Sequence, residues 1–383
     1  MTDPRRAALA SDLAVTADEL TDRALGLFER ESGVAYPAPL VLCGGGRLGR
    51  ITLAGLRGVG VSPAAIADNN AALHGTRLDG CEVMSVESAV RAFGQDAVFV
   101  TTVYTAQPLR SQLKKLGACV ASSRAVFFQH PEQFLPHGSI QWPSAIVDDK
   151  ENILAGLDAW ADDASRDEYV AQVRWQLLQL DQMPAWLPPE QTYFPDDLIR
   201  LGDDEAFVDC GAFDGDTIRA VVQRTGGRFA SLLALEPDPG NYAALTRFVA
   251  TLPLEVRNRI ETCQVAVHSH AATLRFESGD GAGSNLSDGG DLQVSAVALD
   301  DLLRSQPPTF VKMDIEGAEP VALMGARDTL LRHQPTLAVC LYHRREHLWQ
   351  VPRIIVDANP GYRLSLRRHS DESWETICYA LPG

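Results

Sequence analysis

Three side chains that could act as general bases follow two apolar segments in the C-terminal half of the sequence. Asp314 and Glu316 come directly after the run TFVKM, and His343 comes after TLAVCLY. An alcohol becomes an effective nucleophile when a base removes its proton, and both carboxylates and imidazoles can do this. The ordinary pKa of histidine, about 6.5, suits the task at neutral pH. We therefore take all three as candidate catalytic residues. The structural alternatives are a strand-capping histidine for His343 and a helix N-cap for Asp314.

A turn of small residues lies upstream of these side chains. In VDCGAFDGDT, an apolar strand runs into Asp209 and the turn, and a helix is expected to begin at Asp216 or Thr217, which are both good N-caps. Gly211 and Gly215 allow the backbone to approach a ligand closely. Ligands of open α/β sheets bind at the carboxyl ends of strands, so this turn is a predicted ligand site.

A second acid follows at the spacing expected of a ribose ligand. Glu236, in LEPDP, ends the next predicted strand and lies 21 residues after Gly215. A carboxylate there can accept both hydrogen bonds of a ribose diol, although a helix N-cap is the structural alternative. The turn DCGAFDGD is not G-x-G-x-x-G, and an acid-bearing turn suits a ligand with an ammonium group and no pyrophosphate. S-adenosylmethionine is such a ligand.

The elements that must position these residues alternate between strands and helices. Strands are predicted at AFVDCGA, SLLALEP, ETCQVAVHS, TFVKMDIEG and TLAVCLYH, with helices between them. RLSLRRH and TICYALP then predict a final antiparallel pair. Alternation of this kind indicates an α/β fold with helices on both faces of the sheet. The strand plan is that of a class I methyltransferase fold, a Rossmann-like mixed sheet of seven strands.

The motifs VDCGAFDGDT, LEPDP, VKMDIEGAEPVALMGA and LAVCLYH together resemble the FkbM family of methyltransferases. The resemblance covers about residues 206–348, and DIEGAE is its most specific part. It implies S-adenosylmethionine as methyl donor and mostly O-methylation of sugars or secondary metabolites. It also implies a methionine-binding turn at Asp209, Gly211 and Gly215, a ribose ligand at Glu236, and an approach to the adenine near Ala266. The predicted donor contacts are Asp209, Gly211, Ala212, Phe213, Asp214, Gly215, Thr217, Glu236, Pro237 and Ala266.

A second glycine turn lies near the N-terminus. Gly44, Gly46 and Gly49 satisfy G-x-G-x-x-G between the apolar run PLVLC and a helical segment, and Asp68 ends the next predicted strand, 19 residues after Gly49. This is the pattern of a dinucleotide site, and it predicts a second, low-ranked nucleotide site for NAD. The alternative is a fold kept for packing, dimerisation or acceptor binding, since no Tyr-x-x-x-Lys set follows.

The sequence predicts two Rossmann-like domains joined by a helical connector. We place an N-terminal helix at 1–36, a Rossmann-like domain at 37–147, the connector at 148–200 and the FkbM-type domain at 201–383. Four prolines between 184 and 195 mark the end of the connector, which could pair two chains as a homodimer.

The composition limits the partners. The net charge of −16 disfavours a nucleic-acid substrate, which would need a basic surface, and Arg363, Arg367 and Arg368 are interpreted as a solvated strand edge. No apolar run approaches the roughly 18–20 residues that span a bilayer, and no secretory signal is recognised. Seven cysteines without a C-x-x-C pair indicate buried, reduced thiols. We therefore expect a cytoplasmic protein that acts on a small-molecule acceptor.

Three further expectations concern the same region. Asp314, Glu316 and Glu319 could hold Mg²⁺, a minority hypothesis that an assay with EDTA would test. The glycine-rich loop 278–291 could close over a substrate, and His347 is expected on an exposed helix.

The function predicted first is therefore O-methylation from S-adenosylmethionine. The alternatives are an NAD-dependent oxidoreductase or epimerase that uses the N-terminal domain, and a non-catalytic nucleotide-binding protein.

Overall fold

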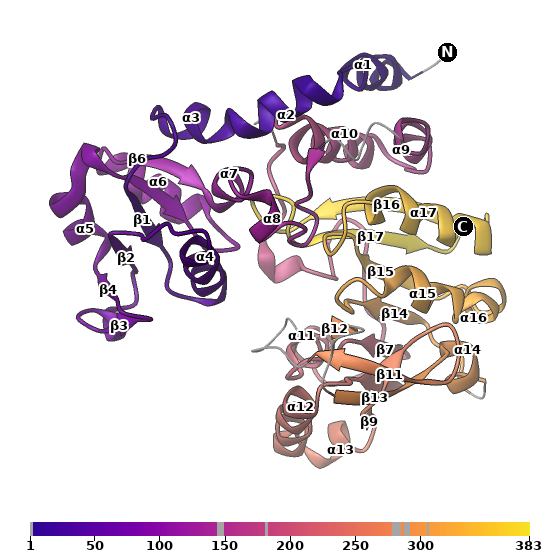
Figure 1. Cartoon of the computed structure of the whole chain (residues 1–383). Helices are drawn as coiled ribbons and strands as arrows, with labels where there is room; N and C mark the ends of the chain where they lie inside the picture. The colour runs from indigo at the N-terminus through magenta and orange to yellow at the C-terminus, as the bar shows by residue number, and fades with distance from the viewer. Residues whose placement is uncertain (1–2, 144–148, 181–182, 278–284, 287–291, 305) are drawn as a thin grey trace. The chain divides into compact units, whose positions relative to one another are not determined.

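The computed structural model in Figure 1 describes residues 3–143, 149–180, 183–277, 285–286, 292–304 and 306–383. The chain forms two compact units. Unit 1 comprises residues 1–154, 170–186 and 370–374, and unit 2 comprises 155–169, 187–369 and 375–383. The predicted connector is thus divided between the units rather than standing outside both.

Three short helices form the N-terminal segment that was predicted to be helical. They are α1 (Pro4–Asp12), α2 (Ala17–Leu25) and α3 (Leu27–Ser32). The breaks have local causes. Thr16 and Glu19 form a capping box that starts α2, and Gly33, with φ of 74°, ends α3 in the left-handed conformation.

Unit 1 is built on a six-stranded sheet with the order β3-β4-β2-β1-β5-β6. All its pairs are parallel except β3 with β4. The strands are β1 (Leu40–Cys43), β2 (Ala65–Ala67), β3 (Arg77–Leu78), β4 (Cys81–Met84), β5 (Val98–Thr101) and β6 (Cys119–Ser122). The helices that follow them are α4 (Arg47–Gly58), α5 (Val86–Phe93), α6 (Gln107–Lys115), α7 (Ser123–Phe127) and α8 (Pro131–Phe134).

Apolar side chains of this sheet are buried on both faces. Leu40 and Leu42 belong to one core cluster, and the alternate residues Val41 and Cys43 belong to another. Continuous burial of a strand is typical of a parallel sheet covered by helices on both sides. The predicted α/β organisation of this region is confirmed.

Unit 2 is built on a seven-stranded mixed sheet with the order β16-β17-β15-β14-β7-β8-β9. The five neighbouring strands β15, β14, β7, β8 and β9 run parallel to one another. Strand β17 is antiparallel to both β15 and β16. The strands are β7 (Ala206–Cys210), β8 (Ser231–Leu235), β9 (Ile260–Cys263), β14 (Phe310–Met313), β15 (Thr336–Cys340), β16 (Arg363–Arg368) and β17 (Thr376–Leu381). This order confirms the predicted fold class.

Helices join these strands, and further helices lie between 149 and 191. In the sheet region they are α11 (Asp216–Thr225), α12 (Pro239–Thr251), α13 (Leu254–Arg257), α14 (Leu299–Leu302), α15 (Glu319–Met324), α16 (Arg327–Arg332) and α17 (His347–Ala358). The earlier segment contains α9 (Lys150–Leu157), α10 (Asp163–Leu178) and a short 3₁₀ helix, Pro189–Gln191. As predicted, no strand is found between 149 and 191 among the described residues.

A small second sheet in unit 2 corrects one predicted strand. The segment ETCQVAVHS was expected to be one strand, but β9 and β10 (Ala266–Val267) belong to different sheets. The chain turns between them, where Val265 N donates to Cys263 O at 3.1 Å. The small sheet has the order β10-β13-β11-β12, with β11 at Ala272–Glu277, β12 at Asn285–Leu286 and β13 at Leu292–Val297. Most of the predicted loop 278–291 lies outside the described residues.

The expectation of a solvated arginine edge is wrong for two of the three arginines. Arg363 is exposed, but Arg368 is buried, and its Nε lies 2.7 Å from Glu168. Arg367 lies 2.7 Å from Asp197. Since a buried guanidinium needs a charged partner, the acids of the preceding segment explain why these arginines are accommodated.

Two smaller expectations concern the membrane and the cysteines. Among the described residues, no helix has the length and apolar character to cross a membrane. All seven cysteines are free thiols, and five of them are buried, as predicted.

Candidate active site

The predicted ligand turn lies where the strand order of unit 2 changes direction. The chain runs from β7 outward to β8 and β9 and then returns to β14 on the other side of β7. Ligands of open α/β sheets bind at such a switch point. The turn after β7 and the segment after β14 meet there, because a Cβ atom on Gly211 would lie 1.9 Å from the carbonyl oxygen of Asp314. Only glycine allows this approach, and its φ of 84° adds a second reason.

A buried ion pair joins the same two strands. Lys312 and Asp209 face each other in the register of β14 and β7, and Lys312 Nζ lies 3.0 Å from Asp209 Oδ1. The ammonium also donates to Gly211 O at 2.7 Å. Both residues are buried, and burial raises the pKa of Asp209 to about 6 against the opposing effect of Lys312. The buried pair therefore holds the first residue of the turn, Gly211, in place.

Glu236 lies against the other side of the turn. Its Oε2 accepts from Phe213 N and its Oε1 from Asp238 N, both at 2.9 Å. Asp238, not Glu236, caps helix α12 by accepting from Gly240 N. The helix-cap alternative for Glu236 is therefore wrong, and burial raises its pKa to about 7.

The remaining turn residues surround this core. Helix α11 begins at Asp216, as predicted, but its N-cap is Gly215, with φ of 93°, and neither Asp216 nor Thr217. Asp214 Oδ1 is buried and has no hydrogen-bond partner among the described residues. Of the other predicted contacts, Ala212 is buried in the turn after β7, and Pro237 follows Glu236. Thr217 is buried in the first turn of α11, and Ala266 belongs to the small sheet.

Asp314 is held by three hydrogen-bond donors. Tyr193 donates to its Oδ2 at 2.6 Å, Tyr342 donates to its Oδ1 at 3.1 Å, and His343 Nε2 lies 3.2 Å from Oδ1. Burial alone would raise the pKa of Asp314, but the bond from His343 and the charge of Lys312 lower it below its usual range. Asp314 is thus a partly buried anion that its hydrogen-bond donors stabilise, and it accepts protons weakly.

His343 lies among carboxylates, which changes its predicted role. Nδ1 is 2.8 Å from Glu319 Oε1, and Nε2 is 3.7 Å from Glu316 Oε2 as well as close to Asp314. Burial would lower the pKa of His343, but Glu319 and Asp314 raise it well above its usual value. The expectation of an ordinary histidine pKa is therefore wrong. A protonated His343 can donate hydrogen bonds but cannot take a proton from an alcohol.

Two neighbours of this cluster were mistaken or missed. His347 was expected to be exposed, but it is buried in α17 with Nδ1 3.3 Å from Glu319 Oε2. Glu375 was missed. Leu341 N donates to Thr376 O at 2.9 Å, which continues the β15–β17 register and places Glu375 beside Tyr342. Burial, with a smaller effect of Asp314, raises the pKa of Glu375 to about 7.

The hypothesised metal ligands are close together but are already bonded. Of the hypothesised ligands, Asp314 and Glu319 form a group with His343 in which the possible ligand atoms all lie within 4.8 Å of one another. Glu316 does not belong to this group, and its Oε2 lies 3.7 Å from His343 Nε2. Because a protonated His343 lies between Asp314 and Glu319, it supplies the positive charge that these carboxylates require. The geometry favours an ion-pair cluster over a Mg²⁺ site.

The N-terminal glycine turn forms a separate arrangement within unit 1. Asp68 Oδ2 accepts from Gly45 N at 2.6 Å, which brings the predicted acid to the turn. A Cβ atom on Gly49 would lie 1.9 Å from Gly44 O, so these two glycines serve contact between the turn and α4. Gly46 has open space around it.

Lys312, Tyr193, Tyr342 and Glu375 are the main residues that the sequence did not single out. Lys312 had a usable signal, since a lysine inside an apolar strand must find a buried acid. Tyr193 and Glu375 had none, because they approach Asp314 from parts of the chain that are distant in sequence.

The comparisons with known proteins agree with this geometry. A family model described as the methyltransferase FkbM domain matches residues 209–365. This match confirms the resemblance seen in the sequence. No curated protein matches the chain.

One solved structure supports the fold, and two others are similar over part of the chain. The methyltransferase FkbM of Methylobacillus flagellatus KT is 24% identical, with a TM-score of 0.73 and coverage of 98% of both chains. Fibrillarin of Aeropyrum pernix, solved with S-adenosyl-L-methionine, is 14% identical, with a TM-score of 0.30 over 48% of this chain and 70% of that one. Precorrin-6y C5,15-methyltransferase of Geobacter metallireducens GS-15 is 13% identical, with a TM-score of 0.31 over 48% of this chain and 83% of that one.

Proposed function

We propose, from the FkbM methyltransferase domain at residues 209–365, that the protein transfers a methyl group from S-adenosylmethionine to a hydroxyl of a small molecule, such as a sugar or secondary metabolite. The observation that carries the proposal is the convergence at one switch point of the Gly211 turn, Glu236 and the Asp314 cluster. The first two suit an adenosyl donor, and the third suits a polar acceptor.

The donor would bind along the turn after β7. Glu236 would accept a hydrogen bond from a ribose hydroxyl, because a carboxylate offers about four acceptor sites, and Phe213 N, Asp238 N and the Asn241 side chain use three of them. Asp214 would accept from the ammonium of the donor, since its Oδ1 is buried without a partner among the described residues. Gly211 and Gly215 would let the chain pass close to the ligand.

The chemistry requires alignment and removal of one proton. The acceptor oxygen forms a bond to the methyl carbon while the carbon–sulfur bond breaks, and the electron pair of that bond stays on sulfur. The alcohol proton must pass to a base. We assign this role to Glu375, because a base works best when its pKa is near the working pH, and Asp314 and His343 are held away from that range. Asp314 would orient the acceptor hydroxyl, and Glu316 would contact it at the exposed side.

A donor-consumption screen tests the proposal. The protein is incubated with S-adenosylmethionine and a panel of sugars and hydroxylated metabolites, and S-adenosylhomocysteine is measured. We expect Asp314→Ala to abolish turnover while donor affinity stays within about tenfold, as expected for a group that acts mainly in the transition state. Wild-type turnover in this variant would refute the role of Asp314. Unchanged wild-type turnover in EDTA would remove the metal hypothesis.

The pH dependence tests the base. Glu375 must be ionised to take a proton, so kcat should rise with pH through about 7 and then level off. Glu375→Gln should lower kcat by about 10²–10⁴-fold and remove this rise. The exposed Glu261→Gln on β9 is the matched control and should keep the wild-type profile. A rise through pH 7 that persists in Glu375→Gln would assign it to another group.

A further inference from the structure

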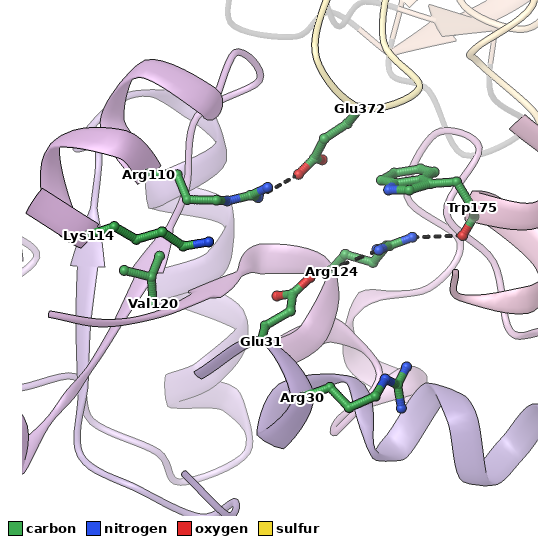
Figure 2. Close-up of a pocket in the computed structure, with 8 residues that line it drawn as sticks. All are labelled: Arg30, Glu31, Arg110, Lys114, Val120, Arg124, Trp175 and Glu372. Atoms are coloured by element: carbon green, nitrogen blue, oxygen red, sulfur yellow. Dashed lines mark hydrogen bonds and ion pairs between the residues drawn. The ribbon is translucent and has the colours of Figure 1, made fainter. Parts of the chain in front are cut away.

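A cavity in unit 1 is lined by cationic side chains from three helices. Its volume is about 280 Å³, and its walls come from α3, α6, the edge strand β6, α7, α10 and the segment 370–374 (Figure 2). Arg30, Arg110, Lys114 and Arg124 bring four positive charges to it, and Glu31 and Glu372 bring two negative charges. Four minus two leaves a formal charge of +2 in a protein whose net charge is −16. This local excess runs against the charge of the whole chain.

Two of the arginines are held in fixed positions. The Arg124 side chain is 3% exposed, its guanidinium lies 3.8 Å over the Trp175 ring, and Nη1 donates to Trp175 O at 2.9 Å. Arg110 Nη2 lies 3.0 Å from Glu372 Oε1. Glu31 Oε1 lies 4.0 Å from Arg124 Nη2, so both carboxylates of the cavity contact guanidinium groups, which remain charged at any relevant pH. A preorganised set of donors loses little entropy when a ligand binds.

The other two cationic side chains of the cavity are Lys114 and Arg30. Lys114 lies four residues after Arg110, on the same face of α6, and Figure 2 shows both side chains directed toward the cavity. Arg30 approaches from α3. Within the described parts of the chain, neither Lys114 nor Arg30 has an ion-pair partner. An ion-pair cluster kept only for stability would not need these two unpaired charges.

We propose that this cavity binds the phosphate group of a small phosphorylated molecule. Guanidinium forks and a lysine ammonium are the side-chain groups that recognise phosphate oxygens. The excess charge matches a phosphate monoester, which carries about −1.5 to −2 at neutral pH. The volume accommodates a phosphate with a group of about the size of one sugar ring. The site is distinct from the glycine turn after β1 and does not depend on the methyl-transfer proposal.

Calorimetric titration of the full chain tests the proposal with probes of defined chemistry. Inorganic phosphate and glucose 6-phosphate should each give saturable binding, while glucose and sodium chloride at matched ionic strength should not. Saturation by phosphate alone would limit the ligand to the free ion and overturn the phosphorylated molecule. No saturable heat with either phosphate compound at about 10 mM would overturn the site altogether.

Variants locate the binding. Lys114→Ala and Arg30→Ala should each weaken phosphate binding by about tenfold or more, the value of one charge-assisted hydrogen bond. Lys115→Ala is the matched control, because Lys115 is the next residue of α6, is exposed and does not line the cavity. Equal affinities in the Lys114 and Lys115 variants would overturn the assignment. All three residues are exposed, so equal melting temperatures without ligand should show that the variants are folded.

Discussion

The two glycine turns of the molecule share a geometry but differ in their charges. In unit 1 the acid Asp68 accepts from Gly45 N, and in unit 2 the acid Glu236 accepts from Phe213 N. Each turn joins a strand that has parallel neighbours on both sides to a helix. The turn of unit 1 matches the dinucleotide pattern better, yet the turn of unit 2 carries the evidence for function.

The difference lies in the strands beside the turns. In unit 2, Asp209 faces Lys312 across β7 and β14, and both are buried. At the equivalent position of unit 1, two residues before the first glycine of the turn, Leu42 faces Val100 across β1 and β5. The Thr102 hydroxyl donates to Cys43 O and Gly44 O, so a neutral group contacts the first glycine carbonyl of this turn, where the Lys312 ammonium does so in unit 2. The glycines therefore determine the backbone path of both turns, whereas the buried charges that indicate a functional site are found beside the turn of unit 2.

Removing Lys312 should have the largest effect on stability. Lys312→Met leaves Asp209 as a buried, unpaired carboxylate, which should cost about 3–5 kcal/mol in free energy of unfolding. The matched change in unit 1, Thr102→Val, removes one hydroxyl and should cost about 1–2 kcal/mol. Urea unfolding followed by circular dichroism measures both. Equal losses in free energy of unfolding would show that the Lys312–Asp209 pair stabilises unit 2 no more than Thr102 stabilises unit 1.

Replacing the acid of each turn with its amide should show which of the two turns binds S-adenosylmethionine. Glu236→Gln replaces one carboxylate oxygen with a donor and should weaken S-adenosylmethionine binding by about 10–100-fold. Asp68→Asn, the same change in unit 1, should leave that affinity unchanged. Calorimetric titration of the donor provides the comparison. A comparable loss in Asp68→Asn would mean that unit 1 contributes to donor binding.

The sequence predicted the fold well because its signals are local. Apolar runs, glycine turns and acids at strand ends specified both parallel sheets and the position of the donor turn. The Lys312–Asp209 pair was also readable, since FVDC and FVKM align residue by residue in the register of β7 and β14.

The protonation of the site could not be predicted, because it depends on residues that only the fold brings together. His343 looked like a base until Glu319 and Asp314 were found on both sides of its ring. Glu375 reaches the cluster through the pairing of β17 with β15, and Tyr193 reaches it from the segment before β7. The pKa of each group follows from these contacts and not from its own neighbours in the chain.

The smallest expected effect concerns Gly46, and it tests the dinucleotide alternative for unit 1. A Cβ atom at Gly46 would meet nothing within 4 Å, so Gly46→Ala should change stability by no more than about 0.5 kcal/mol. Gly49→Ala, the control, places a Cβ against Gly44 O and should be clearly destabilising. In a dinucleotide site the middle glycine admits the pyrophosphate, so an NADH affinity lowered by Gly46→Ala would favour a bound cofactor. If fluorescence titration of NADH shows no binding to wild type or variant, the N-terminal glycines serve packing, and the contrast between the two turns is complete.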